Sequence, residues 1–100
     1  MAQRDFEPPP PPDRTAPFSH LGEEEIESLY SRSGLYRIIV SRDRAGRYRI
    51  HRQRWDTGDW DVARVAQWLE DDRMATITDT LENARSLARQ RLEATPDGPA

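Results

Sequence analysis

The feature that most constrains the fold of this chain is an alternation of apolar and polar side chains on either side of a turn sequence. The turn, Asp43–Gly46, has aspartate at the first and glycine at the fourth position of a type I turn. The common three-residue loop with a left-handed glycine would pair Asp43 with Arg47. Opposite residues in 35–55 would then have numbers that sum to 90. The sequence therefore predicts a β-hairpin in a defined register.

The two faces of this hairpin differ in character. One face carries the even-numbered residues Tyr36, Ile38, Val40, Tyr48 and Ile50. The other carries the odd-numbered residues Leu35, Arg37, Ile39, Arg47, Arg49, His51, Gln53 and Trp55. A slip of one residue would mix the two sets, so turn and pattern agree on the register. We expect the even-numbered face to be core and the odd-numbered face to stay available to a partner.

Helical patterns flank the hairpin. Near the C-terminus, Asp79 and Glu82 have capping-box spacing, and the following apolar residues form one helical face, which comprises Leu81, Ala84, Leu87, Ala88 and Leu92. Residues 20–33 predict a short helix, because Ile26, Leu29 and Tyr30 form one stripe. Residues 60–69 fit a strand or a helix, and we favour a third strand because a short glycine turn continues a meander.

These elements predict an α+β fold with the order α-β-β-β-α. A three-stranded antiparallel meander would have a C-terminal helix on one face and a short N-terminal helix. The expected boundaries are a disordered proline-rich tail at 1–18, a single domain at 19–94 and a disordered end at 95–100. Pro8–Pro12 should favour polyproline II as a spacer, although Pro9, Pro12 and Arg14 also have the spacing of one class of SH3 ligand.

Composition excludes several classes of site. The chain has no cysteine and two histidines, so we expect no disulfide, no metal and no cofactor. It has no apolar segment that would predict a signal peptide or a membrane span, and we expect a cytoplasmic protein. The net charge is −3, yet residues 32–55 carry eight arginines and one acid between two acidic flanks.

Asp56–Thr57–Gly58 resembles the active-site tripeptide of the retroviral-type aspartic proteases, in which two copies of the aspartate share a proton. In those proteases the tripeptide lies in an apolar setting that buries the carboxylates. Here it lies in a polar turn between Trp55 and Asp59. The sequence therefore predicts a non-enzymatic protein.

Two resemblances concern architecture. A three-stranded sheet followed by a helix resembles the arm-binding domains of tyrosine recombinases and the plant ethylene-response DNA-binding domains. That resemblance implies a sheet that lies in the major groove of DNA. The residues that would contact bases are Arg37, Arg47, Arg49 and His51, and those that would lie near phosphates are Arg42 and Arg44. The hairpin together with the run "DTLENA" also resembles the antitoxin half of toxin–antitoxin pairs with a partial ribonuclease-H-like fold, apart from the insertion at 56–77.

We therefore predict a non-enzymatic protein-interaction module, of an adaptor or regulatory kind, that self-associates through one sheet face. The partner would be a second copy or another protein, and no membrane or small-molecule substrate is inferred. The candidate partner-binding residues are Leu35, Arg37, Ile39, Arg47, Arg49, His51 and Trp55. The alternative is a nucleic-acid-binding module that uses the arginine-rich hairpin.

Overall fold

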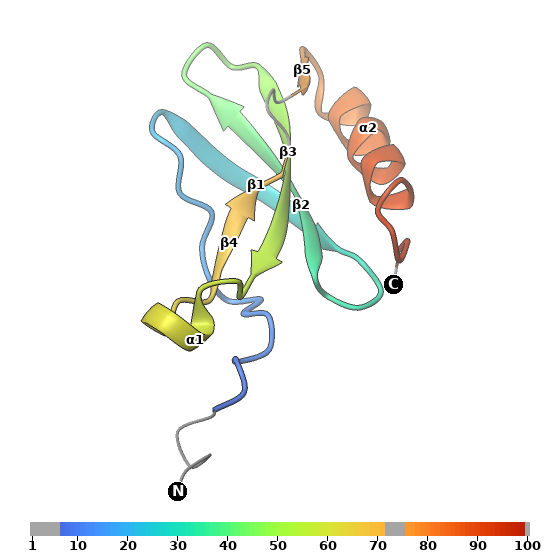
Figure 1. Cartoon of the computed structure of the whole chain (residues 1–100). Coiled ribbons are helices and arrows are strands. Elements are labelled where there is room, and N and C mark those ends of the chain that lie inside the picture. Colours follow the sequence, from blue (N-terminus) through green and yellow to red (C-terminus); the bar gives the residue numbers. More distant parts are fainter. Residues whose placement is uncertain (1–6, 72–75, 100) are drawn as a thin grey trace, which may run out of the picture.

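The computed structural model describes residues 7–71 and 76–99, which form an antiparallel sheet with one long helix on one face (Figure 1). The strands meander in the order β1-β2-β3-β4, and β5 pairs with β3. The elements are β1 (Glu23–Tyr30), β2 (Tyr36–Asp43), β3 (Tyr48–Asp56), α1 (Trp60–Ala63), β4 (Gln67–Glu70), β5 (Thr76–Thr78) and α2 (Leu81–Glu93). The predicted α+β class and the meander followed by a C-terminal helix are confirmed.

The β2–β3 hairpin has the predicted register. Tyr36 pairs with Arg54, and the pairing continues without interruption to Arg42 and Tyr48. The Asp43 amide donates to the Arg47 carbonyl at 2.9 Å, which closes the loop. Gly46 has φ +82°, a left-handed conformation that glycine adopts without a steric cost.

The core lies between the even-numbered hairpin face and α2. Ile38, Val40 and Ile50 are fully buried against the helix. The helix contributes the face that its sequence predicts, with Ala84, Ala88 and Leu92 buried and Leu81 and Leu87 at the edge. Full burial of one isoleucine side chain is worth about 1.5–3 kcal/mol. The even-numbered face is therefore confirmed as core.

The predicted helix at 20–33 is wrong, because residues 23–30 form strand β1 on the free edge of β2. The reason lies in β2, whose residues from Arg37 to Ser41 are all buried. A strand buried on both faces needs neighbours on both edges to satisfy its backbone. Pairing across the sheet thus outweighed the helical spacing of three apolar residues in a glutamate-rich segment.

The predicted strand at 60–69 is partly confirmed. Residues 60–63 form the single turn α1, which ends at Arg64 in a left-handed conformation. Gln67–Glu70 then form β4, which pairs antiparallel with β3 and places Trp68 opposite Trp55. Strand β5 pairs with the first half of β3 and is a strand that the sequence did not predict. Within the described parts of the chain the sheet therefore has five strands instead of three.

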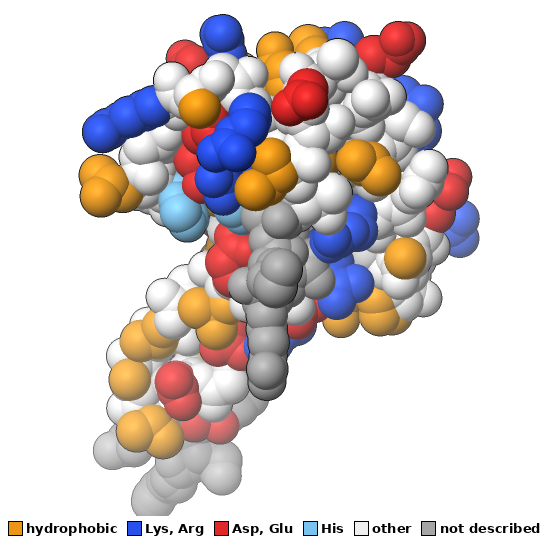
Figure 2. All heavy atoms as spheres, turned by 90° about the horizontal axis from the view of Figure 1, so that it is seen from above, with side chains coloured by type: hydrophobic (Ala, Val, Ile, Leu, Met, Phe, Trp, Pro, Cys, Tyr) orange, Lys and Arg blue, Asp and Glu red, His pale blue; other side chains and the backbone are white. Residues whose placement is uncertain are grey.

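Both ends of the described chain contact the sheet or its turns. The Arg32 amide donates to the Gly98 carbonyl at 2.9 Å, and the Ser33 amide donates to the Asp97 carboxylate at 2.6 Å. The N-terminal segment, residues 7–18, runs past α1 and β4 on the side of the sheet opposite α2 (Figure 1). Seen from above, a lobe that carries both hydrophobic and acidic side chains extends from one side of the body (Figure 2). Residues 1–6, the first part of the expected tail, lie outside the described residues.

Candidate functional site

The candidate site is the contact between the N-terminal segment and the odd-numbered side of the sheet. Five side chains of the folded body donate hydrogen bonds to five backbone carbonyls of this segment. The pairs are Trp60 to Glu7 (2.7 Å), Trp55 to Pro10 (3.2 Å), Trp68 to Asp13 (2.9 Å), Tyr30 to Arg14 (3.0 Å) and Arg37 to Ala16 (2.7 Å). We call the surface formed by the three tryptophans the indole groove. All three tryptophans of the chain donate to the segment.

The sheet positions two of the indoles directly. Trp55 on β3 and Trp68 on β4 are register partners, and their ring centroids lie 5.3 Å apart in an edge-to-face arrangement. The Arg37 guanidinium covers the Trp68 ring at 4.6 Å, within the range of a cation–π contact. Arg37 also donates to the Gln53 side-chain oxygen at 2.7 Å, so the orientation of its guanidinium is fixed by this hydrogen bond and by the contact with the Trp68 ring. The turn α1 supplies the third indole, Trp60.

A cavity lies between the segment and these aromatic rings. Its volume is about 300 Å³, and its walls include Asp13 and Ala16 on one side and Trp55 and Trp68 on the other. The segment therefore touches the body through discrete hydrogen bonds and leaves room beside them. Most of its side chains stay exposed, with Pro12 and Ala16 half-buried and Phe18 buried at the end of the segment.

The structure divides the predicted partner-binding residues into two groups. Arg37, Ile39 and His51 are buried at 2%, 0% and 4% exposure. The expectation that the whole odd-numbered face stays available is therefore wrong at its centre. The cover comes from the chain itself, since the Phe18 ring lies 4.9 Å from the His51 ring. Leu35, Arg47, Arg49 and Trp55 keep part of their surface exposed.

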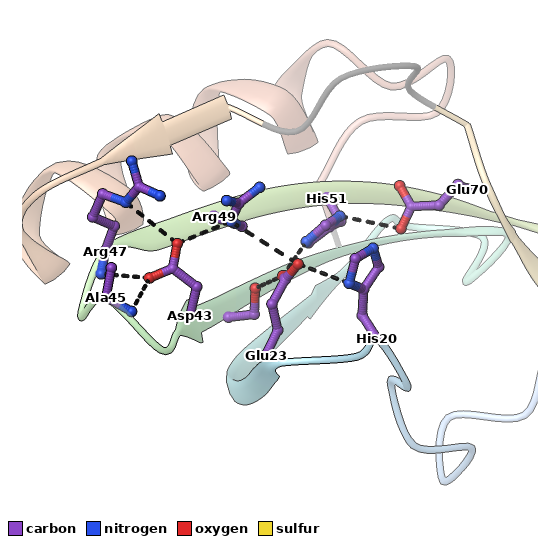
Figure 3. A network of polar contacts seen from close by, with 9 residues as sticks. His20, Glu23, Asp43, Ala45, Arg47, Arg49, His51 and Glu70 are labelled. Atoms are coloured by element: carbon purple, nitrogen blue, oxygen red, sulfur yellow. Dashed lines mark hydrogen bonds and ion pairs between the residues drawn. The ribbon is translucent and has the colours of Figure 1, made fainter.

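His51 belongs to a buried polar network that Figure 3 shows from close by. Its Nε2 lies 2.7 Å from a carboxylate oxygen of Glu23, and its Nδ1 lies 3.2 Å from one of Glu70. The Ser41 hydroxyl also donates to Glu23, and His20 Nδ1 lies 2.8 Å from the same carboxylate. Both ring nitrogens of His51 face acceptors, and only the imidazolium form can donate from both at once.

The pKa values of this network move in opposite directions. Burial alone would lower the pKa of His51, but the hydrogen bonds and charges of Glu70 and Glu23 outweigh it and raise the pKa overall. Burial would raise the pKa of Glu23, but hydrogen bonds from Ser41 and His51 lower it overall. The charged forms of the pair therefore stabilise each other inside the fold.

Two arginines near the turn of the hairpin, Arg47 and Arg49, have an acidic partner. Arg47 and Arg49 both contact the Asp43 carboxylate, with nitrogen–oxygen distances of 3.4 and 3.1 Å (Figure 3). A backbone hydrogen bond from Arg47 is the main reason that the pKa of Asp43 is lowered. Arg49 also lies 4.0 Å from Glu23. The turn thus neutralises part of the positive charge that the sequence concentrates in this segment.

Sequence reasoning did not identify the indole groove as one site. Trp55 was a candidate, but Trp60, Trp68 and Tyr30 were not in the predicted set. A signal was present, since three tryptophans and five consecutive prolines occur in one short chain. Indole is a hydrogen-bond donor only, and proline lacks the backbone N–H and keeps its carbonyl acceptor.

Comparison of the chain with protein-family models, curated proteins and solved structures found no match, so the interpretation of the site depends on its geometry. Among residues 7–71 and 76–99, no cluster of three or more histidine or acidic side chains is arranged to hold a metal ion. No helix in the same described residues is long and apolar enough to cross a membrane.

Proposed function

We propose that this protein is a small non-enzymatic interaction module that binds an extended peptide segment across the odd-numbered side of its sheet. One observation carries the proposal. Five side chains of the body donate to five main-chain carbonyls of a single segment, three of them in residues 7–13 and two in the turn at 14–16. Hydrogen bonds to main-chain carbonyls recognise the conformation of a peptide backbone, and peptide-binding modules use such main-chain hydrogen bonds for affinity.

The composition of the groove supports the same proposal. Tryptophan, tyrosine and arginine are the residue types that dominate the binding energy of protein interfaces. Here three tryptophans, Tyr30 and Arg37 are the five donors. Self-association through this side of the sheet stays a prediction, and a second copy would have to bind where the chain's own segment now lies.

The nucleic-acid alternative receives less support from the same geometry. Arg37 and His51, which the DNA-binding resemblance would aim at bases, are buried beneath the segment or in the polar network. Arg47 and Arg49 contact Asp43. An ion pair must be broken before either guanidinium can contact a phosphate, which weakens the electrostatic contribution to binding.

Heteronuclear NMR of the full-length chain tests the proposal, because the three indole N–H signals all report on the groove. We would titrate labelled protein with two pools of ten-residue peptides, one rich in proline and one without it. A single-stranded and a double-stranded oligonucleotide would be titrated at low salt in parallel. Saturable shifts of the indole signals with either peptide pool support the proposal.

The control variant is Trp55→Phe, which keeps an aromatic ring and removes one donor. Loss of one hydrogen bond worth about 0.5–1.5 kcal/mol should weaken the binding of a peptide to the open groove about two- to twelvefold. Oligonucleotide binding without peptide binding overturns the proposal in favour of the alternative. Peptide binding that leaves the indole signals in place overturns the assignment of the site.

A further inference from the structure

We propose that the indole groove is a receptor for polyproline II segments, that residues 7–13 are its intramolecular ligand, and that a proline-rich segment of another protein binds by displacing them. This inference rests on the proposed function and adds the chemical class of the ligand. The observations that carry it are the spacing of the bound carbonyls, the chemistry of the donors and the tether that holds the segment.

The spacing of the carbonyls identifies the conformation that the groove recognises. The three indoles donate to the carbonyls of Glu7, Pro10 and Asp13, which are three residues apart each time. A polyproline II helix has three residues per turn, so these carbonyls lie in one column along its side. Successive members of the column are separated by about 9 Å. A strand would present carbonyls on one side at a spacing of two residues, and an α-helix would use its carbonyls internally.

The donors match the chemistry of such a segment. Polyproline II forms no internal hydrogen bonds, so every carbonyl needs an outside donor. Pro8–Pro12 have no backbone N–H to offer in return, and an indole accepts no hydrogen bond. A β-strand ligand would leave its N–H groups without acceptors among the three indoles. The groove therefore favours a ligand that presents carbonyls only.

The segment is tethered directly to the groove that it occupies. Phe18 is buried, and its amide donates to the Glu25 carboxylate at 3.1 Å, which anchors the segment five residues after Asp13. A short tether of this kind gives an effective concentration in the millimolar range. The same segment of a second copy, present at micromolar concentration, cannot compete with a tethered segment at millimolar effective concentration. The external ligand is therefore a proline-rich segment of a different protein that binds the groove more tightly than residues 7–13 do.

The tether also determines how strongly the chain inhibits its own groove. If the segment has an intrinsic dissociation constant of about 100 μM and an effective concentration of about 1 mM, an external ligand binds about tenfold more weakly than to an open groove. Removal of the polyproline II conformation from residues 8–12 should therefore increase the affinity for an external ligand about tenfold.

The test uses the full-length chain and a full-length variant that combines Pro8→Gly, Pro9→Gly, Pro10→Gly, Pro11→Gly and Pro12→Gly. The probe is a fluorescent peptide with the sequence of residues 7–16, EPPPPPDRTA. The matched probe has alanine in place of the five prolines and the same charge. Fluorescence anisotropy gives the affinities, and urea unfolding checks that both proteins are folded. We expect the proline peptide to bind the glycine variant about tenfold more tightly than the wild type.

The outcomes separate this inference from the proposed function. Equal affinity for the proline and alanine peptides overturns polyproline II recognition and leaves a general peptide-binding module. Equal affinity of the wild type and the glycine variant overturns the intramolecular occupancy. A concentration-dependent dimer of the wild type that the glycine variant lacks, measured by light scattering, overturns it as well, because the segment would then be exchanged between copies. Absence of binding by either peptide to either protein overturns the inference and the proposed function together.

Discussion

Two neighbouring residues on β2 provide the sharpest test of which sheet faces are covered. Ile38 and Ile39 are both fully buried, but their side chains lie on opposite faces of the strand. Ile38 packs in the core beside α2. Ile39 lies on the side that the sequence predicted to be free and that the structure covers with the N-terminal segment. We predict that Ile38→Ala and Ile39→Ala destabilise the protein to a similar extent.

The magnitude follows from burial. An isoleucine-to-alanine substitution at a fully buried position costs about 2–5 kcal/mol, which combines the lost transfer free energy and the cavity that remains. The same loss at a solvent-exposed position costs less than about 0.5 kcal/mol. In a chain of this size each kcal/mol lowers the melting temperature by about 4–8 °C, so each buried variant should melt at least about 8 °C below the wild type.

Urea unfolding followed by far-UV circular dichroism measures the free energy of unfolding for each variant. Val62→Ala is the control, because Val62 is 90% exposed in α1. A loss of 2 kcal/mol or more for Ile38→Ala, with a loss below 0.5 kcal/mol for Ile39→Ala, would refute the reasoning, since the odd-numbered face would then be open.

Three other predictions concern the buried Glu23–His51 pair, the conformation of Gly46 and the N-cap of α2. The stability that His51 contributes is present below its ordinary pKa of 6.5 and is lost as the pH rises through its raised pKa. The stability that Glu23 contributes is lost as the pH falls through its lowered pKa. Urea unfolding against pH should therefore give a maximum between the two, and His51→Gln should flatten the alkaline side. Gly46→Ala should cost about 1–2 kcal/mol, because φ is +82° there, while Gly58→Ala should not; equal thermal melts would contradict this. Thr80→Ala should cost about 1 kcal/mol through loss of the N-cap of α2, measured by unfolding, and Thr80→Ser should restore most of it.

The parts of the fold that depend on local chemistry were predictable from the sequence. The loop at Asp43–Gly46 determines the register of the hairpin by itself, and the apolar face of α2 repeats with helical spacing. The N-cap shows the limit of this reasoning. Asp79 and Glu82 have the spacing of a capping box, yet Thr80 is the N-cap and its side chain accepts from the Asn83 amide. Helix boundaries are less well determined by pattern than helix existence.

The elements that the sequence did not predict depend on contacts between distant segments. The stripe of Ile26, Leu29 and Tyr30 is compatible with a helix until β2 requires a neighbour on its second edge. The indole groove likewise needs Trp60, Trp68 and residues 7–13 to meet, although more than 40 positions separate them in the chain. No local pattern carries that information, because the contacts join side chains of the body to backbone carbonyls, which every residue has.

The charge segregation of the sequence has a physical explanation in the sheet. An acidic segment at 23–27 precedes a basic segment at 37–54, and antiparallel pairing places the first beside the second. Glu23 then lies 2.7 Å from His51 and 4.0 Å from Arg49, so one acid of the first segment meets two basic groups of the second. The buried Glu23–His51 pair favours the observed pairing over a helix, since a helical segment 20–33 would leave the Nε2–H donor of His51 without this carboxylate as its acceptor. Arg49 thus has an acidic partner in β1 as well as Asp43, while Arg47 pairs with Asp43 and Arg54 with Asp56 inside the hairpin itself. The three tryptophans of the indole groove, in contrast, do not belong to the core between the sheet and α2.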